Sequence, residues 1–349
     1  MMKTKLFALT LLSVFAVAAV AFVGGDVVKG DSTKRASNEL VALLPDSDVV
    51  ATGNVKQFFG DALPRVMAAN QPMLDKVMGH LNVMTEKTGI DIRKFDSVAV
   101  GAKLKGNDLS KMDIDAVAIV RGDVSTAALL GLAKLAGKGT YREEKIGERT
   151  VYIFKAGDVV DKTVTAKAAK TGMADHLARE LTQEMAVTAY DGGTLVVGSV
   201  DMVRATLSHT TAVSTTLTSM LSNREASVFT FAGRMPENVA STFGLDADGL
   251  SKNIDSIRYM SGSMDVGAFG MNVSITARTA TTAQANSFGK LLSDMRFAGK
   301  AIFSGAKRPD QQLYGRLIEN AKITLRDNDV SLDLTVPQAD VDKLVAMIK

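Results

Sequence analysis

Cysteine is absent from the 349 residues, and so is tryptophan. Without cysteine the chain cannot use disulfides, thiol nucleophiles, CxxC redox chemistry or cysteine-based zinc sites. Aromatic residues make up only 5% of the chain, so the core must be built from Val, Leu, Ile, Ala and Met. Because 46% of the residues are hydrophobic, a chain of this length can bury a sizeable core, and disorder over its whole length is excluded.

Sequence motifs of the common enzyme classes are missing as well. The three histidines (His80, His176 and His209) are far apart, and no HExxH, G-x-S-x-G, G-x-x-x-x-G-K-[ST] or G-x-G-x-x-G occurs. The net charge of +3 is small and forms no basic stripe, so no nucleic-acid partner is expected. We expect a non-enzymatic protein without a cofactor, and an envelope hydrolase that uses scattered Asp, Ser and His is the alternative.

The first 25 residues differ from the rest of the chain. A short basic start, MMKTK, precedes the apolar run LFALTLLSVFAVAAVAFVGG, which contains the small-x-small pattern Ala19-Val20-Ala21. This pattern predicts a signal peptide over residues 1–21 and an exported protein, periplasmic or extracellular. The alternative is an uncleaved anchor in the inner membrane that extends to residue 25 and contacts the membrane through residues 5–24. Residues 22–37 are interpreted as a polar spacer.

Hydrophobic periodicity predicts alternating strands and helices after the spacer. A strand is expected at 49–55, and helices over 56–88 divided by Pro64 and Pro72. Paired strands are expected at 97–104 and 115–121. Hairpins are predicted at 141–157, around Asp191-Gly192-Gly193 and around Asp327, and closing helices follow the last two hairpins.

The order of these elements repeats. Five elements follow one another in the same order in both halves of the chain. The segment TGIDIRKFDSV (88–98) has a counterpart, FGLDADGLSKNIDSI, at 243–257. The predicted fold class is therefore α+β, with two similar halves, each an antiparallel sheet with helices packed on one face. The first repeat is placed at 38–208, a Ser/Thr-rich connection at 209–224 and the second repeat at 225–349.

Acidic and glycine residues mark the predicted turns. Asp caps helical turns and forms side-chain turns before strands, and glycine ends helices and supplies hairpin turns. The residues assigned this structural role are Gly89, Asp91, Asp96, Asp191, Gly192, Gly244, Asp246, Asp255 and Asp327. A cation site at Asp246 and Asp248 is a weak candidate, because "DADG" resembles only the start of a calcium loop and Ile257 stands where the bidentate Glu should be. No catalytic or metal residue is otherwise assigned.

The pattern LLPDSDVVATGNV, TGIDIRKFDSVAVG and AVTAYDGGTLVVGS resembles exported bacterial proteins of unknown function with a duplicated α+β body. The similarity covers most of residues 38–348 and carries no catalytic residues over. The expected function is a binding or structural module of the bacterial envelope that holds a hydrophobic or peptide ligand, with an unknown ligand or envelope protein as partner. A membrane-anchored assembly factor is a further alternative.

Overall fold

A computed structural model of the chain describes residues 39–88, 91–106, 113–123, 125–127, 130–131, 140–155, 183–222, 227–237, 239–242 and 248–347. The strands within these residues are β1 (Val49–Asn54), β2 (Phe95–Lys105), β3 (Asp113–Gly122), β4 (Arg142–Ile146), β5 (Arg149–Lys155), β6 (Glu184–Ala189), β7 (Thr194–Ser199), β8 (Phe229–Arg234), β9 (Ile257–Gly267), β10 (Gly270–Thr279), β11 (Ala321–Arg326) and β12 (Asp329–Pro337).

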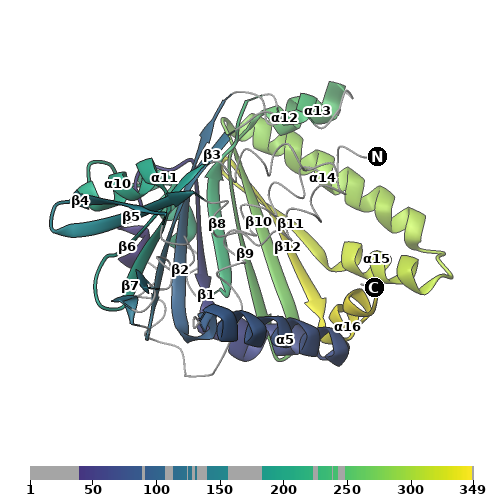
Figure 1. Ribbon diagram of the computed structural model, residues 1–349. Coiled ribbons are helices and arrows are strands. Elements are labelled where there is room, and N and C mark those ends of the chain that lie inside the picture. Colours follow the sequence, from purple (N-terminus) through teal and green to yellow (C-terminus); the bar gives the residue numbers. More distant parts are fainter. Residues whose placement is uncertain are drawn as a thin grey trace.

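The helices connect and cover these strands (Figure 1). They are α3 (Val55–Gln57), the π-helical turn η1 (Phe58–Ala62), α4 (Leu63–Val66), α5 (Gln71–Thr88), the 3₁₀ turn η2 (Ile92–Lys94), α10 (Val200–Ser208), α11 (Thr215–Ser222), α12 (Val239–Thr242), α13 (Asp248–Asp255), α14 (Thr282–Phe303), α15 (Pro309–Asn320) and α16 (Gln338–Ala346). Among the described residues, no helix has the length and apolar character needed to cross a membrane.

All described strands belong to one antiparallel sheet in the order β11-β12-β10-β9-β8-β1-β2-β3-β7-β6-β5-β4. The α+β class is therefore confirmed. The sequence predicted an antiparallel sheet in each half, which could lie side by side or form one continuous surface, and the described strands form one continuous sheet. The join is made by β1 and β8, which pair from Val49 with Gly233 to Gly53 with Phe229. This pairing removes two exposed edges at once, which favours one sheet over two.

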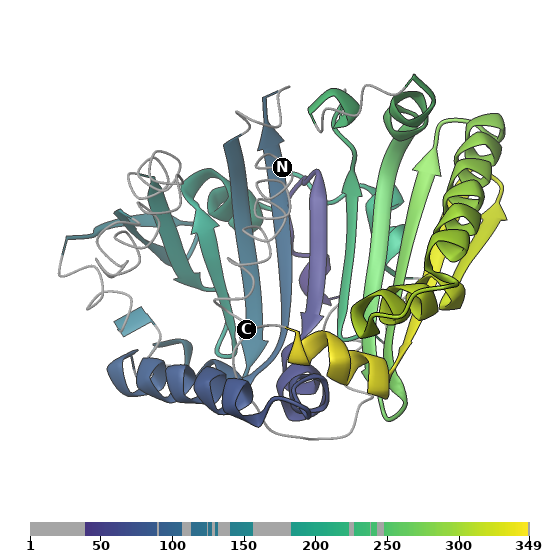
Figure 2. The ribbon, with the colours of Figure 1, turned by 90° about the vertical axis from the view of Figure 1, so that its right-hand side faces the viewer.

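The two faces of the sheet are covered differently. One rung of directly opposed residues crosses the middle of the sheet from Val197 through Ala118, Val100, Ala51, Phe231, Gly262 and Ile275 to Leu332. The face that carries this rung is called the front face, and Figure 2 looks onto it. The opposite face, which carries Thr230 and Thr276, is called the back face.

The main apolar core lies on the back face of the first half. There α10 and α11 bury Met202, Val203 and Leu217 against Val50 and Ile119 of the sheet. On the front face of the same half, side chains of η1 and α5 pack against β2 and β3. Helices therefore cover both faces of the first half, and the expectation of one covered face is wrong there, because β2 and β3 are apolar on both faces.

Several local predictions are confirmed. β1 begins at Val49, and Pro72 lies in the first turn of α5, where a missing backbone N–H costs least. Pro64 lies in α4, which continues from η1 without a break, so the helical region is divided at residues 67–70 and not at Pro64. The predicted hairpins are β4–β5, β6–β7 and β11–β12, and Gly147 (φ 59°) and Asp327 (φ 53°) take left-handed conformations in two of their turns. The domain boundaries stay predictions, although the Ser/Thr-rich connection contributes buried Leu217 to the core.

Candidate functional site

Apolar side chains of β8, β9 and β10 stay partly exposed on the front face. We call the set Phe231, Met260, Met264, Val273 and Ile275 the front apolar window. The first four are half-buried, and Ile275 is 36% exposed. The Phe231 ring lies over Gly262, where an added Cβ would come within 2.5 Å of a ring carbon. The missing side chain at Gly262 thus lets an aromatic ring lie on the sheet surface.

The back face directly behind the front apolar window shows the opposite combination. Thr230, Ser261 and Thr276 are polar, yet only 4%, 3% and 7% of their surfaces are exposed. Hydroxyl pairs satisfy two of them, Thr52 with Thr230 at 2.6 Å and Thr276 with Ser331 at 2.8 Å. In β10, polar and apolar residues alternate, but the apolar Ile275 is more exposed than its polar neighbour Thr276. Apolar side chains are usually buried and polar side chains are usually exposed, so the reverse arrangement in β10 marks this part of the sheet as a candidate functional site.

Helices border the front apolar window without closing over all of it. α14 contacts β10, β11 and β12, α16 contacts β10 and β12, and η1 and α4 contact β9. In Figure 2, α14 and α15 stand at the right of the sheet and α5 and α16 along its lower edge. The floor of the front apolar window is thus a sheet, and helices form its borders.

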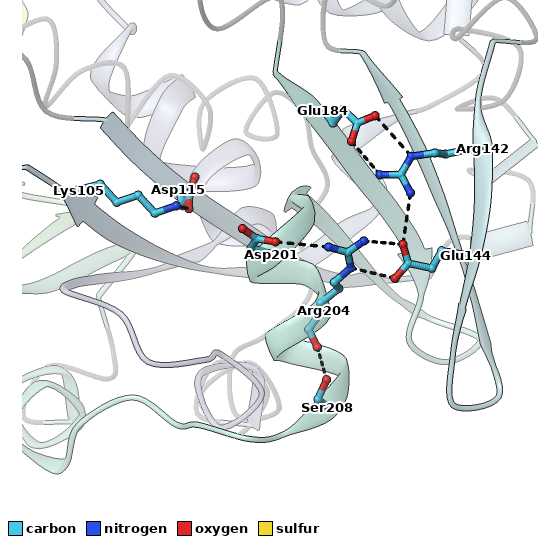
Figure 3. A network of polar contacts seen from close by, with 8 residues as sticks. All are labelled: Lys105, Asp115, Arg142, Glu144, Glu184, Asp201, Arg204 and Ser208. Atoms are coloured by element: carbon cyan, nitrogen blue, oxygen red, sulfur yellow. Dashed lines mark hydrogen bonds and ion pairs between the residues drawn. The ribbon is translucent and has the colours of Figure 1, made fainter.

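A second polar feature joins the edge strand β4 to its neighbours (Figure 3). Arg204 of α10 donates from Nε and Nη2 to the two carboxylate oxygens of Glu144, at 2.8 and 2.6 Å. Arg142 donates from Nη2 to Glu184 of β6 at 2.8 Å and from Nη1 to Glu144 at 3.3 Å. We call these four residues the β4 ion network.

The β4 ion network keeps its carboxylates charged. Hydrogen bonds from Arg204 lower the pKa of Glu144, and those from Arg142 lower the pKa of Glu184. The same bonds raise the pKa of both arginines. Since charges at a sheet edge discourage pairing with another strand, the network fits a protective role at β4.

Asp265 of β9 is a carboxyl group whose pKa moves in the other direction. Burial raises its pKa, and backbone N–H groups of Val266 and Val228 oppose the change. Asp265 lies opposite Asn272 on the back face. We interpret it as a structural feature, because among the described residues only backbone groups and burial, and no charged partner, set its pKa.

Three acidic residues that the sequence assigned to turns of the first half lie among the described residues, and each has a defined contact. Asp91 caps η2 by accepting from the backbone N–H of Arg93 at 3.1 Å and also from its guanidinium at 2.8 Å. Asp96 is the second residue of β2 and not a turn residue before the strand, and it forms an ion pair with Lys56. Asp191 accepts from the N–H of Gly193 at 2.9 Å, and Gly192 lies in the same exposed turn.

In the second half, Asp255 ends α13 and accepts from the N–H of Ala240 at 3.1 Å. Asp327 occupies the β11–β12 turn. Gly89, Gly244 and Asp246 lie outside the described residues, and the side chain of Asp248, the first residue of α13, does too. Within the described part of the chain, the acidic and histidine side chains form no group of three suited to a metal ion.

The two described histidines contact neutral groups. His80 contacts the carbonyl of Lys76 at 2.6 Å, and His209 contacts the Tyr190 hydroxyl at 3.1 Å and the Leu207 carbonyl at 3.1 Å. His176 lies outside the described residues. The described side chains thus do not assemble the Asp, Ser and His arrangement of the hydrolase alternative.

Sequence reasoning missed both the front apolar window and the β4 ion network. The apolar residues of β9 and β10 were placed on strands, but the alternation of a strand does not say which face stays open. The partners in the network come from three elements, and its two arginines, Arg142 and Arg204, are 62 residues apart. The run of four charged residues in β4, "REEK" at 142–145, is the one signal that could have pointed to an edge strand.

No family model matches the chain, and no curated protein matches it. Similar solved structures include crystal forms I, III and IV of TP0453, at 10%, 9% and 9% sequence identity and TM-scores of 0.42, 0.41 and 0.42. These comparisons cover 88%, 88% and 91% of this chain and 96%, 98% and 99% of the TP0453 chain. A likeness at this level carries no conclusion about function.

Proposed function

We propose that this chain is a non-enzymatic binding module that holds a hydrophobic ligand, or the apolar side of a peptide, on the front apolar window. The observation that supports the proposal is the exposure of Ile275 (36%) beside buried Thr276 (7%) in the same strand. Burying apolar surface contributes about 25 cal/mol per Å². The front apolar window leaves aromatic, Met and aliphatic side chains partly exposed, so the folded protein lacks the stabilisation that their full burial would give. An apolar ligand that covers these side chains would supply it.

The residue types in the front apolar window also favour a ligand of loosely defined shape. Met260 and Met264 have flexible, polarisable side chains that adapt to different surfaces. Phe231 offers a ring face above Gly262. A site with two Met residues and one ring suits acyl chains or apolar side chains better than a polar metabolite, which would need converging hydrogen-bond donors and acceptors.

The proposal includes an internal duplication of the sheet. Outward from the central pair, the first half runs β1-β2-β3-β7-β6 and the second runs β8-β9-β10-β12-β11. β2 and β9 both have 11 residues, and β3 and β10 both have 10. α10 follows β7 just as α16 follows β12. The shared order and lengths support two copies of one unit, with β4 and β5 present only in the first.

We further propose that the protein is exported to the bacterial envelope, with residues 1–21 as its signal peptide. This part of the proposal is supported by the basic start, the apolar run and Ala19-Val20-Ala21. The first residue of the mature protein, found by N-terminal sequencing, tests it. A mature chain that begins before residue 15 would instead support a membrane anchor.

Ligand binding is tested with a fluorescent dansyl fatty acid as the probe. The absence of Trp keeps protein emission low, so the change in dansyl emission on binding can be followed directly. We expect saturable binding, and Ile275→Lys should weaken it at least tenfold because a buried ammonium would face the acyl chain. Ile275 is already partly open to solvent, so the variant should fold.

Phe269→Lys is the matched control, because Phe269 is 92% exposed and lies outside the front apolar window. It should leave the affinity for the probe unchanged. Non-saturable binding, or an equal loss in both variants, would show that the front apolar window is not a ligand site. Mass spectrometry of what copurifies with the native protein would then identify any ligand bound elsewhere.

A further inference from the structure

The described sheet has two outer strands, β4 at one end and β11 at the other. In Figure 2, β11 and β12 are the yellow strands at the right-hand end of the sheet, beside α14. An outer strand exposes backbone N–H and C=O groups on its free side, and an extended peptide can bind to them as a further strand. The side chains along each free edge decide whether that edge favours such a peptide.

The turn between β11 and β12 shows which backbone groups of β11 point outward. Because this turn has two residues, Arg326 and Asp329 on either side of it form a hydrogen-bonded pair. Every second residue of an antiparallel strand bonds to the same neighbour, so the N–H and C=O groups of Ile323 and Leu325 point away from β12. Among the described residues, no backbone group pairs with them on that side. β11 thus presents the backbone of two residues to a further strand.

The free edge of β4 differs in its side chains. Its own two-residue turn directs the backbone groups of Glu143 and Lys145 outward, and both side chains are charged and exposed. The outward positions of β11 are apolar instead. Leu325 lies against Gly289 of α14 and is still 44% exposed. Of these two edges, β11 is the one whose side chains favour a further strand, because that strand would cover apolar surface.

Basic side chains line the back face of β11. Lys322 and Arg326 are exposed on this face. The carboxylates directly opposite them on β12 already accept hydrogen bonds from Ser274 and Arg278. Within the part of the chain that the structure describes, neither Lys322 nor Arg326 forms an ion pair. Two positive charges are therefore available beside the free backbone groups.

We propose that the free edge of β11 binds an extended peptide segment in which apolar and acidic residues alternate. Successive side chains of a strand point to opposite faces of a sheet. The apolar residues of the peptide would then lie beside Ile323 and Leu325, and its acidic residues beside Lys322 and Arg326. Opposite charges on adjacent strands stabilise their pairing. This site is separate from the front apolar window, which lies on β8, β9 and β10.

The β11 strand of a second copy does not have this composition. The side chains of β11 on the back face are Lys322, Thr324 and Arg326, so no register of two β11 strands places an acidic residue beside a basic one. The charges therefore favour an acidic segment over a second β11. A single added strand buries less than the roughly 800 Å² per partner of stable interfaces, so we expect weak, reversible binding.

Fluorescence anisotropy tests the choice of partner on the full chain. The probe is fluorescein-Val-Glu-Val-Glu-Val-Glu, and fluorescein-Val-Lys-Val-Lys-Val-Lys is its charge-reversed control. We expect saturable binding of the acidic peptide, roughly tenfold tighter than that of the basic peptide. Lys322→Gln combined with Arg326→Gln should weaken it about fivefold. The matched control is Lys252→Gln with Lys307→Gln, which removes the same charge from two exposed lysines outside β11 and should leave the affinity unchanged.

Ile323→Pro tests the backbone contact. It removes the outward N–H of residue 323 and no bond to β12, and proline is tolerated on an edge strand where the N–H faces solvent. We expect saturable binding of the acidic peptide to be lost. Ile323→Thr keeps the N–H and should retain binding. Both variants should still bind the dansyl fatty acid, so failure of this proposal and failure of the front apolar window can be told apart.

Amide hydrogen exchange of the native chain, followed by NMR, locates the bound peptide without any substitution. The acidic peptide should slow exchange at Ile323 and Leu325 and leave Lys322 and Thr324, which already bond to β12, unchanged. The proposal is overturned if exchange at Ile323 and Leu325 stays the same. It is also overturned if both peptides bind equally, or if the two pairs of Gln substitutions weaken binding equally.

Discussion

Asp340 is the charged side chain with the least exposure among the described residues, at 5%. Arg316 of α15 donates to it from Nε at 3.0 Å and from Nη2 at 2.6 Å, which ties α15 to α16. These bonds lower the pKa of Asp340. A carboxylate in this position needs its arginine, because a buried charge without a partner is strongly unfavourable.

The first prediction concerns Asp340→Asn. Because the folded-state pKa of Asp340 lies below that of the unfolded chain, its pair stabilises the protein above about pH 4 and loses this effect as the pH falls through the folded value. We expect the variant to melt about 2–4 °C below the native protein at pH 7. The difference in melting temperature should shrink as the pH is lowered below about 4. Thermal melts followed by circular dichroism from pH 2 to 7 measure it.

Asp342→Asn serves as the control for this pH series. Asp342 belongs to the same helix but accepts a hydrogen bond from Gln338 at 2.8 Å, which an amide can also accept. It should change the melting temperature less, and with little dependence on pH. A pH-independent loss in Asp340→Asn would mean that packing, and not the ion pair, is what the substitution disturbs.

The edge strand β4 exposes backbone N–H and C=O groups that could pair with another strand. β4 pairs only with β5, so its other edge has no strand beside it among the described residues. The β4 ion network ties this strand to β6 and to α10 through Glu184 and Arg204. Exposed ion pairs are individually weak, but a network that spans three elements can restrict fraying of an edge strand.

The second prediction concerns Arg204→Gln. We expect faster amide hydrogen exchange in β4, residues 142–146, by several-fold, because Glu144 loses both bonds to α10. Exchange in β2 and β3 at the centre of the sheet should not change. High salt should reduce the difference between native and variant proteins, since it screens exposed charges.

Arg308→Gln is the matched control for Arg204→Gln, because Arg308 also forms an exposed pair, with Asp310 at 2.7 Å, but at the start of α15. It should leave exchange in β4 untouched. Equal exchange in β4 for the native protein and Arg204→Gln would show that strand pairing with β5 alone holds this edge.

The sheet runs through the whole molecule without a break. β1 is the innermost strand of the first half, β8 is the innermost strand of the second half, and the two strands pair with each other. Val50 of β1, Ala232 of β8 and Leu217 of α11 lie in one apolar cluster. A core shared in this way couples the stability of the halves. We therefore expect the two halves of the sheet to unfold together.

The third prediction uses the absence of tryptophan. Tyr152→Trp in β5 and Tyr314→Trp in α15 each place a single fluorescent reporter in one half. We expect both reporters to give the same melting midpoint as circular dichroism. Midpoints that differ by more than about 5 °C, an interval worth more than about 1 kcal/mol in a chain of this size, would show that the halves unfold as independent domains.

Local patterns were predictable because short-range physics decides them. The turn at Asp191 follows from Asp-Gly-Gly between β-rich runs, and α5 begins where Pro72 allows a helix to begin. The open front apolar window was not predictable. Ile275 and Val100 lie in the same rung and are both apolar, yet Val100 is 5% exposed, since helices cover it, and Ile275 is 36% exposed.

The sequence by itself determined the alternation of polar and apolar residues in the strands, the hairpin turns at Asp191 and Asp327, and the absence of disulfides and thiol chemistry. Tertiary structure alone decided that β1 pairs with β8, about 180 residues later, and so that one sheet forms. It also decided which face helices cover and which charges meet at β4. Pairing and coverage depend on contacts between distant segments, and no local pattern specifies those contacts.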